Sequence, residues 1–305
     1  MDIKHIHAGG YSARINLDRG ANCISLRHNA TSAVILREPP ESYELDNPFL
    51  YGMPILFPVN RISGAEFEFE GRTYRFPLNE EATGCHLHGM MHGMPFKLLS
   101  CDESSLAASY RAECGEYIGF PHSFEILIEY KLSDEGLDKR VTVTNLSDEN
   151  MPCLIGFHTT FNARPFGNDV ETRVLVDIDK EYERNMTNYL PTGRCPAPDR
   201  ITEALKSGSL DPLSEPISRH YLAGGDMRLE ISSGELTVSY ENSKNMPFRL
   251  IYNGDASGFI CLEPQTSLAN SPNSKFTREA AGFSYIEPHK QKIFTSRISI
   301  KSKEK

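Results

Sequence analysis

Several features that mark other protein classes are missing from this sequence of 305 residues. No stretch approaches 18 consecutive apolar residues, and the opening MDIKHIHAGG has no apolar signal-peptide core, so the sequence predicts neither a membrane span nor a secretory leader. We therefore expect a cytoplasmic protein. Positive charge is also scarce: 32 Lys and Arg against 41 Asp and Glu give a net charge of -9. This charge disfavours nucleic acid and anionic membranes as partners, because like charges repel.

Paired cysteines are missing as well. The seven cysteines are scattered and odd in number, and no two form a C-x-x-C pair. This spacing argues against a disulfide framework and against a thiolate zinc site. We expect most of them to be small buried apolar residues.

The dominant pattern that is present is alternation of apolar and polar residues with period two, which is typical of half-buried strands. Residues 67–78 (FEFEGRTYRFPL) alternate on both sides of Gly71 and predict a hairpin. Residues 123–132 (SFEILIEYKL) predict one strand, and residues 227–242 predict two strands joined at Ser233 and Gly234. These patterns favour antiparallel sheets with one buried face.

Only residues 199–208 (DRITEALKSG) predict a helix, with Asp199 as its N-cap and Gly208 as its end. The Pro-, Gly- and Ser-rich segment 185–216 is too long for a hairpin loop and predicts an irregular excursion. Strand patterns continue on both sides of it, and there is no internal repeat. We predict an all-β fold, a large antiparallel β-sandwich forming a single domain over residues 1–305.

Three histidines, His86, His88 and His92, lie within CHLHGMMHG at residues 85–93. An imidazole can donate and accept hydrogen bonds or bind zinc, so the spacing leaves open metal binding, sugar binding and packing. Three-histidine zinc ligation is geometrically possible, but there is no H-E-x-x-H pattern, and the neighbouring glycines suit tight turns. We expect neither a metal nor a cofactor.

Two further residues could do acid–base chemistry. His158 follows the apolar run MPCLIGF, which is typical both of a core histidine bonded to a carbonyl and of a functional one. Glu263 follows ICL in a strand pattern, where a carboxylate either meets a partner at a sheet edge or has a raised pKa in a cleft. Glu287, in a second Glu-Pro pair, is a rival to Glu263, but we expect it in an exposed turn before the last strand.

Five motifs in a fixed order resemble the aldose 1-epimerase (galactose mutarotase) family. They are NRISGAEFEFEGRTY from Asn60, LHG at 87–89, NLSDENMPCLIGFHTTFN from Asn145, LPTG at 190–193 and CLEPQT from Cys261. The resemblance implies the galactose mutarotase-like supersandwich fold. It also implies an isomerase that interconverts the α and β anomers of an aldose without a cofactor.

The resemblance implies a role for each matching residue. Opening a hemiacetal requires a base at the C1 hydroxyl and an acid at the ring oxygen. Glu263 matches the base and His158 the acid. The residues expected to bind the sugar are Asn60, Arg61, His86, His88 and Gln265, whereas His92 is expected to be structural or exposed.

Two departures from the family pattern concern the substrate. The chain has no tryptophan after the histidine–glycine turn, and it has Ser218, Arg219 and His220 where many members carry a sugar-binding aspartate. Arg219 in that place would favour an anionic sugar such as a hexose 6-phosphate or a uronic acid, because a guanidinium binds anions bidentately. The alternative is that Arg219 points to solvent.

The sequence leaves other functions open. A non-catalytic carbohydrate-binding or regulatory protein would need Arg61 and His88 but not the pair of His158 and Glu263. A glycosidase normally needs two carboxylates in its cleft, and only one is proposed here. A polysaccharide lyase on a similar sandwich is a further alternative. The sequence identifies neither the sugar nor the oligomeric state.

Overall fold

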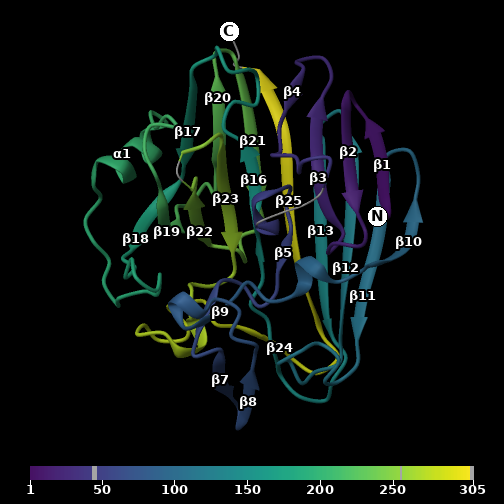
Figure 1. The fold of residues 1–305 in the computed structure, drawn as a ribbon, viewed down its shortest axis with the longest axis vertical. Coiled ribbons are helices and arrows are strands. Elements are labelled where there is room, and N and C mark those ends of the chain that lie inside the picture. Colours follow the sequence, from purple (N-terminus) through teal and green to yellow (C-terminus); the bar gives the residue numbers. More distant parts are fainter. Residues whose placement is uncertain (43–46, 255, 303–305) are drawn as a thin grey trace.

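The structure, a computed structural model, describes residues 1–42, 47–254 and 256–302. Its largest sheet has eight antiparallel strands in the order β10-β11-β12-β13-β25-β21-β20-β17 (Figure 1). These strands are β10 (Lys97–Cys101), β11 (Ser105–Ala112), β12 (Phe124–Ser133), β13 (Gly136–Asn145), β25 (Gln291–Ser302), β21 (Leu236–Asn242), β20 (Leu229–Ser233) and β17 (Thr172–Val176).

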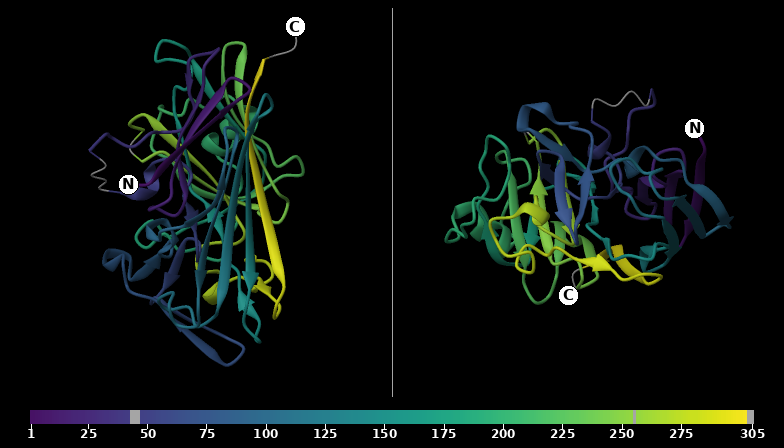
Figure 2. Two further views of the ribbon diagram at one scale, coloured as in Figure 1. Left: turned by 90° about the vertical axis from the view of Figure 1, so that its right-hand side faces the viewer. Right: turned by 90° about the horizontal axis from the view of Figure 1, so that it is seen from below.

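Two further antiparallel sheets pack against the largest one. The first has the order β18-β19-β22-β23-β15-β5, with β16 also paired to β23, and the second has the order β1-β2-β3-β4. Their strands are β18 (Ile178–Tyr182), β19 (Ser218–Ala223), β22 (Phe248–Tyr252), β23 (Phe259–Gln265), β15 (Gly156–Phe157), β16 (Thr159–Asn162), β5 (Ile55–Leu56), β1 (Ile3–Ala8), β2 (Tyr11–Asn16), β3 (Asn22–His28) and β4 (Ala33–Val34). Strands β1 and β2 contact β12, and Phe161 of β16 packs on Tyr240 of β21. The left view of Figure 2 shows the two layers from the side.

Short elements complete the fold. They are the strand pairs β6 (Arg61–Ser63) with β9 (Cys85–Leu87), β7 (Glu66–Phe69) with β8 (Arg72–Arg75) and β14 (Met151–Pro152) with β24 (Tyr285–Ile286), the single-turn helices η1 (Pro48–Leu50), η2 (Glu81–Thr83), η3 (Met91–Gly93) and η4 (Ser271–Asn273), and the helix α1 (Arg200–Ser207). The predicted all-β antiparallel sandwich is therefore confirmed.

The strand patterns produce the core as predicted. Along β12, every second side chain from Phe124 to Leu132 is buried, while those between them are partly or fully exposed. The main apolar cluster draws on all three large sheets and extends from Ile6 to Ile298 along the chain. Burial of these side chains is the main favourable contribution to folding.

The predicted helix is confirmed at both ends. The Asp199 side chain accepts hydrogen bonds from the backbone N–H groups of Ile201 and Thr202, at 3.1 and 3.0 Å. Gly208 ends the helix with a φ of 68°, a left-handed conformation that glycine adopts without steric cost. No other α-helix is found in the described residues, and α1 is too short and too polar to cross a bilayer.

All seven cysteines are free thiols. Four are buried, as expected, and three are exposed; the exposed ones are Cys101, Cys114 and Cys195.

Candidate active site

A cavity of about 510 Å³ lies where β15 and β16 pair with β23, and the loop after β18 contributes to its lining. Its lining includes Phe49, Arg61, His88, His158, Arg184 and Glu263. A larger hollow of about 670 Å³ lies against β1, β2 and β3, but none of its titratable side chains is buried. The smaller cavity is the candidate site, because its lining includes the buried titratable side chains of His88, His158, Arg184 and Glu263.

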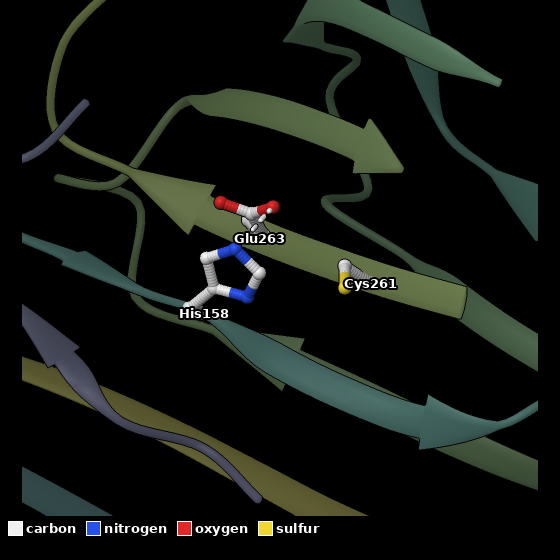
Figure 3. A group of neighbouring side chains, drawn as sticks. All are labelled: His158, Cys261 and Glu263. Atoms are coloured by element: carbon white, nitrogen blue, oxygen red, sulfur yellow. Dashed lines mark ion pairs between the residues drawn. The ribbon is translucent and has the colours of Figure 1, made fainter. Parts of the chain in front are cut away.

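The strand register brings His158 and Glu263 together from opposite sides of one ladder. Gly156 of β15 pairs with Gln265, and Thr159 of β16 pairs with Leu262, so His158 lies at the break between the two strands, opposite Glu263 (Figure 3). The His158 Nε2 atom is 3.3 Å from Glu263 Oε1. Both side chains are almost fully buried, at 4% and 0% exposure.

Burial dominates the electrostatics of this pair. Loss of hydration raises the pKa of Glu263 to about 8, although Gln265, Arg184 and Arg61 act in the opposite direction. Loss of hydration also lowers the pKa of His158 to about 3. At neutral pH the free protein therefore holds one proton on the pair, and that proton lies on the carboxyl group.

A chain of amides fixes the orientation of the carboxyl group. The Asn60 Oδ1 atom accepts from the backbone N–H of Arg61 at 2.9 Å, so its Nδ2 atom must be the donor to Gln265 Oε1, at 3.1 Å. Gln265 therefore presents its own Nε2 to Glu263 Oε2, at 3.0 Å. Asn60 and Gln265 thus lie behind Glu263 rather than in the cavity lining.

Arg61 lines the cavity, but two of its nitrogens are occupied. Its Nε and Nη2 atoms donate to the Glu80 carboxylate at 2.6 and 2.7 Å, and its guanidinium lies 4.6 Å from the ring centre of Tyr189. Burial alone would raise the pKa of Glu80, but hydrogen bonds from Arg61 and Thr83 lower it more. Glu80 is thus an ionised second carboxylate of the cavity, already bound by Arg61.

The LHG motif forms the turn that presents His88. His88 and Gly89 have φ values of 64° and 65°. A β-carbon on residue 89 would overlap the backbone carbonyl of Phe57, so only glycine fits here. The His88 ring is 5.3 Å from that of His158, and its Nδ1 atom has no hydrogen-bond partner among the described residues. Burial lowers the pKa of His88 well below its usual value, so the ring is neutral.

The other two histidines of the motif point elsewhere. His86 is fully buried, stacks on Phe76 and hydrogen-bonds the Pro77 carbonyl through Nδ1 at 2.7 Å, outside the cavity lining. His92 packs against Phe49 with ring centres 4.4 Å apart. The described residues do not gather the three histidines into a set of metal ligands.

One other group in the described chain has ligand atoms close enough for a cation. These atoms belong to His158, Cys261 and Glu263 and all lie within 4.8 Å of one another (Figure 3). Burial raises the pKa of the Cys261 thiol well above its usual value. Binding a cation here would therefore require release of the thiol and carboxyl protons, against the raised pKa values of Cys261 and Glu263.

The structure corrects the expectation for Arg219. Its guanidinium donates to Glu181 at 3.0 and 3.1 Å and to Asp199 at 2.7 Å, and it does not line the cavity. Arg219 is therefore already neutralised by two carboxylates, and the argument for an anionic sugar at this residue is wrong. Glu287 is exposed after β24, as expected.

Sequence reasoning missed Arg184 and Tyr189, which line the cavity from the loop after β18. Residues 183–194 form a hairpin, and Arg184 makes a single antiparallel β-bridge with Pro191 of the LPTG motif. Arg184 thus lies in the arm of this hairpin that faces the LPTG arm. The local sequence signal for this hairpin is weak: residues 185–189 (NMTNY), between Arg184 and the LPTG motif, contain two asparagines that are typical of turns.

Comparison with known proteins identifies the family and supports the fold. The family model for aldose 1-epimerase matches residues 2–292. A galactose mutarotase-like protein from Clostridium acetobutylicum is 30% identical, with a TM-score of 0.89 over 98% of this chain and 94% of that one. A galactose 1-epimerase from Lactobacillus acidophilus shares the fold at 16% identity, with a TM-score of 0.74 over 100% and 96% of the two chains. The LacX protein of Lactococcus lactis is 27% identical over 72% of this chain and 74% of its own length. The chain belongs to the aldose 1-epimerase family.

Proposed function

We propose that this protein is a mutarotase, an aldose 1-epimerase that interconverts the α and β anomers of an aldose. The observation that carries the proposal is the buried pair of His158 and Glu263, 3.3 Å apart at the wall of a polar cavity. Family membership supports it. A sugar-binding protein without turnover has no need of an acid and a base at this distance.

The reaction needs one proton in the pair. In the active arrangement Glu263 is ionised and His158 is protonated. This arrangement forms when sugar hydroxyls bind the carboxylate and the proton moves from the carboxyl group of Glu263 to the imidazole of His158. Glu263 then takes the proton of the C1 hydroxyl, the bond from C1 to the ring oxygen breaks, and His158 protonates that oxygen. Rotation about C1–C2 and the reverse steps give the other anomer, with no net gain or loss of protons.

The surrounding residues have supporting roles in this proposal. Arg61 and His88 contact sugar hydroxyls, because both line the cavity beside the pair. Asn60 and Gln265 act through Glu263 by orienting its carboxyl group. We assign His86 to the support of the 85–93 turn, because it packs on Phe76 outside the lining.

The test is magnetisation exchange between the two anomeric proton signals of an aldose. Glu263→Gln and His158→Asn should each slow catalysed exchange by at least about a hundredfold, since each removes a proton-transfer partner. Matched controls are Glu287→Gln, which changes the other Glu-Pro pair, and His289→Asn, an exposed histidine bound to Asp148. Both controls should retain wild-type rates.

The competing function gives a different result. If the wild-type protein binds aldoses in calorimetry but does not accelerate anomer exchange for any of them, the protein is a carbohydrate-binding protein and the mutarotase proposal fails. Wild-type rates in both pair variants would also overturn it.

A further inference from the structure

Arg184 is a buried cation without a carboxylate partner among the described residues. Its side chain lines the cavity although the residue is only 8% exposed. Within the part of the chain that the structure describes, its guanidinium donates one hydrogen bond, to the Ser218 hydroxyl at 2.7 Å, and the Tyr189 ring centre is 5.7 Å away. Burial lowers the pKa of Arg184 to about 10, which leaves it fully protonated at neutral pH.

The carboxyl groups that act on Arg184 or line the cavity with it are already committed. Glu181 receives two hydrogen bonds from Arg219, and Glu80 is bound by Arg61. Glu263 is held in its protonated form by burial. In the free protein, no carboxylate of the described residues is therefore left to pair directly with Arg184, and a buried charge without a partner is costly.

The other neighbouring groups do not change this balance. His220, fully buried beside Arg184 on β19, is kept neutral because burial lowers its pKa well below the usual value. Arg61, the other cation in contact with Tyr189, adds positive charge rather than removing it. The electrostatic field at this end of the cavity therefore favours a bound anion.

The fold holds Arg184 in place. Tyr182 pairs with His220 in the β18–β19 ladder, and continuing that register sets residue 184 opposite residue 218, where the hydrogen bond to Ser218 forms. The hairpin closes behind it, with the Asn185 N–H bonded to the Leu190 carbonyl at 2.9 Å. A guanidinium fixed in this way is organised in advance for a bidentate partner.

We propose that Arg184 is the anion-binding residue of the cavity and that the substrate is an aldose carrying an oxyanion, a carboxylate or a phosphate, on a carbon other than C1. The inference rests on the proposed mutarotase function for the location of C1. The hydroxyl at C1 must be free for the ring to open, which excludes an aldose 1-phosphate. Ser218 adds a hydroxyl beside the guanidinium that can bind the same oxyanion.

The test compares neutral and anionic forms of one sugar. We measure kcat/KM by magnetisation exchange for glucose, glucuronate and glucose 6-phosphate, and for the galactose series. In the wild-type protein, one anionic form in either series should exceed its neutral counterpart by at least about tenfold, and whether that form is the uronate or the 6-phosphate identifies the oxyanion. Arg184→Gln should abolish this preference, measured as the ratio of anionic to neutral kcat/KM, and Arg184→Lys should retain part of it.

Arg140→Gln is the control, because Arg140 is an exposed arginine of β13 that pairs with Glu129 and does not line the cavity. Its ratio of anionic to neutral kcat/KM should equal that of the wild-type protein. An unchanged ratio in Arg184→Gln, or a wild-type preference for the neutral sugars, would overturn the anion proposal.

A binding arm separates this proposal from the mutarotase function. Methyl glycosides of the same sugars cannot open, so their calorimetric affinities report the subsite without turnover. Tighter binding of an anionic glycoside that is lost in Arg184→Gln supports the subsite even if no aldose is interconverted. Equal binding of neutral and anionic glycosides rejects it even if the protein is an active mutarotase.

Discussion

Gln265 donates a hydrogen bond to Glu263 across 3.0 Å, and the bond can run in only one direction. A backbone N–H fixes the Asn60 amide, and the Asn60 amide in turn fixes that of Gln265. A donor held in this way favours the ionised form of the carboxyl group, which is the form required of a base.

Removing that donor should shift the pH dependence of the reaction. Gln265→Met should raise the pKa of Glu263 further, because the hydrogen bond from Gln265 lowers it. We expect the alkaline limb of the kcat/KM profile to move upward by about one pH unit and the plateau to fall about tenfold. A lower plateau with an unmoved limb would mean that Gln265 is only structural.

The wild-type profile should lose activity above about pH 8. Below the pKa of Glu263, about 8, the pair retains its one proton, and above it the proton is lost and His158 has none to give to the ring oxygen. Catalysed kcat/KM should therefore fall about tenfold for each further pH unit. The measurement subtracts the spontaneous reaction at each pH. A flat profile to pH 9.5 would contradict this assignment.

Glu263→Gln should stabilise the free protein. A carboxyl group whose pKa is raised on folding contributes stability below its unfolded pKa and loses it as the pH rises through the folded value. Between about pH 4.5 and 8 this loss is about 1.4 kcal/mol per pH unit in the wild-type protein and absent from the variant. The difference in unfolding free energy between the two, measured in urea, should grow across that window. A constant difference would contradict the raised pKa.

Gly89→Ala should be much more damaging than Gly84→Ala. Both glycines have φ near 66°, at 65° and 67°, but a β-carbon meets the Phe57 carbonyl at residue 89 and nothing within 4 Å at residue 84. The shared conformational cost is about 1 kcal/mol, and the overlap adds about 2 kcal/mol or more. Thermal unfolding measures both. The Gly89 variant should also show a raised KM, because its turn presents His88.

Chelation should leave catalysis unchanged. The acid and base act directly on the sugar in the proposed reaction, and no step uses a metal. Dialysis against a strong chelator should therefore change neither the exchange rate nor the melting temperature. Stoichiometric zinc that is lost together with activity would contradict this expectation, and the described residues whose ligand atoms gather closely enough to hold it are His158, Cys261 and Glu263.

Local sequence patterns determined much of the fold. The alternation in residues 123–132 predicts β12 because a strand needs only its own period and one buried face. Asp199 and Gly208 predict the ends of α1 because caps act within a few residues. The motifs also indicated His158 and Glu263, whose catalytic roles remain predictions. The single-domain organisation is likewise still a prediction.

Only the tertiary structure decided which charges are paired. Arg184 and Arg219 both lie in polar stretches near the ends of neighbouring strands, and nothing local distinguishes them. The β18–β19 register and the approach of α1 give Arg219 two carboxylates, whereas the hairpin at 183–194 turns Arg184 into the cavity with none among the described residues. Charge pairing and burial depend on groups distant in sequence, and these same long-range contacts set the pKa values of the site.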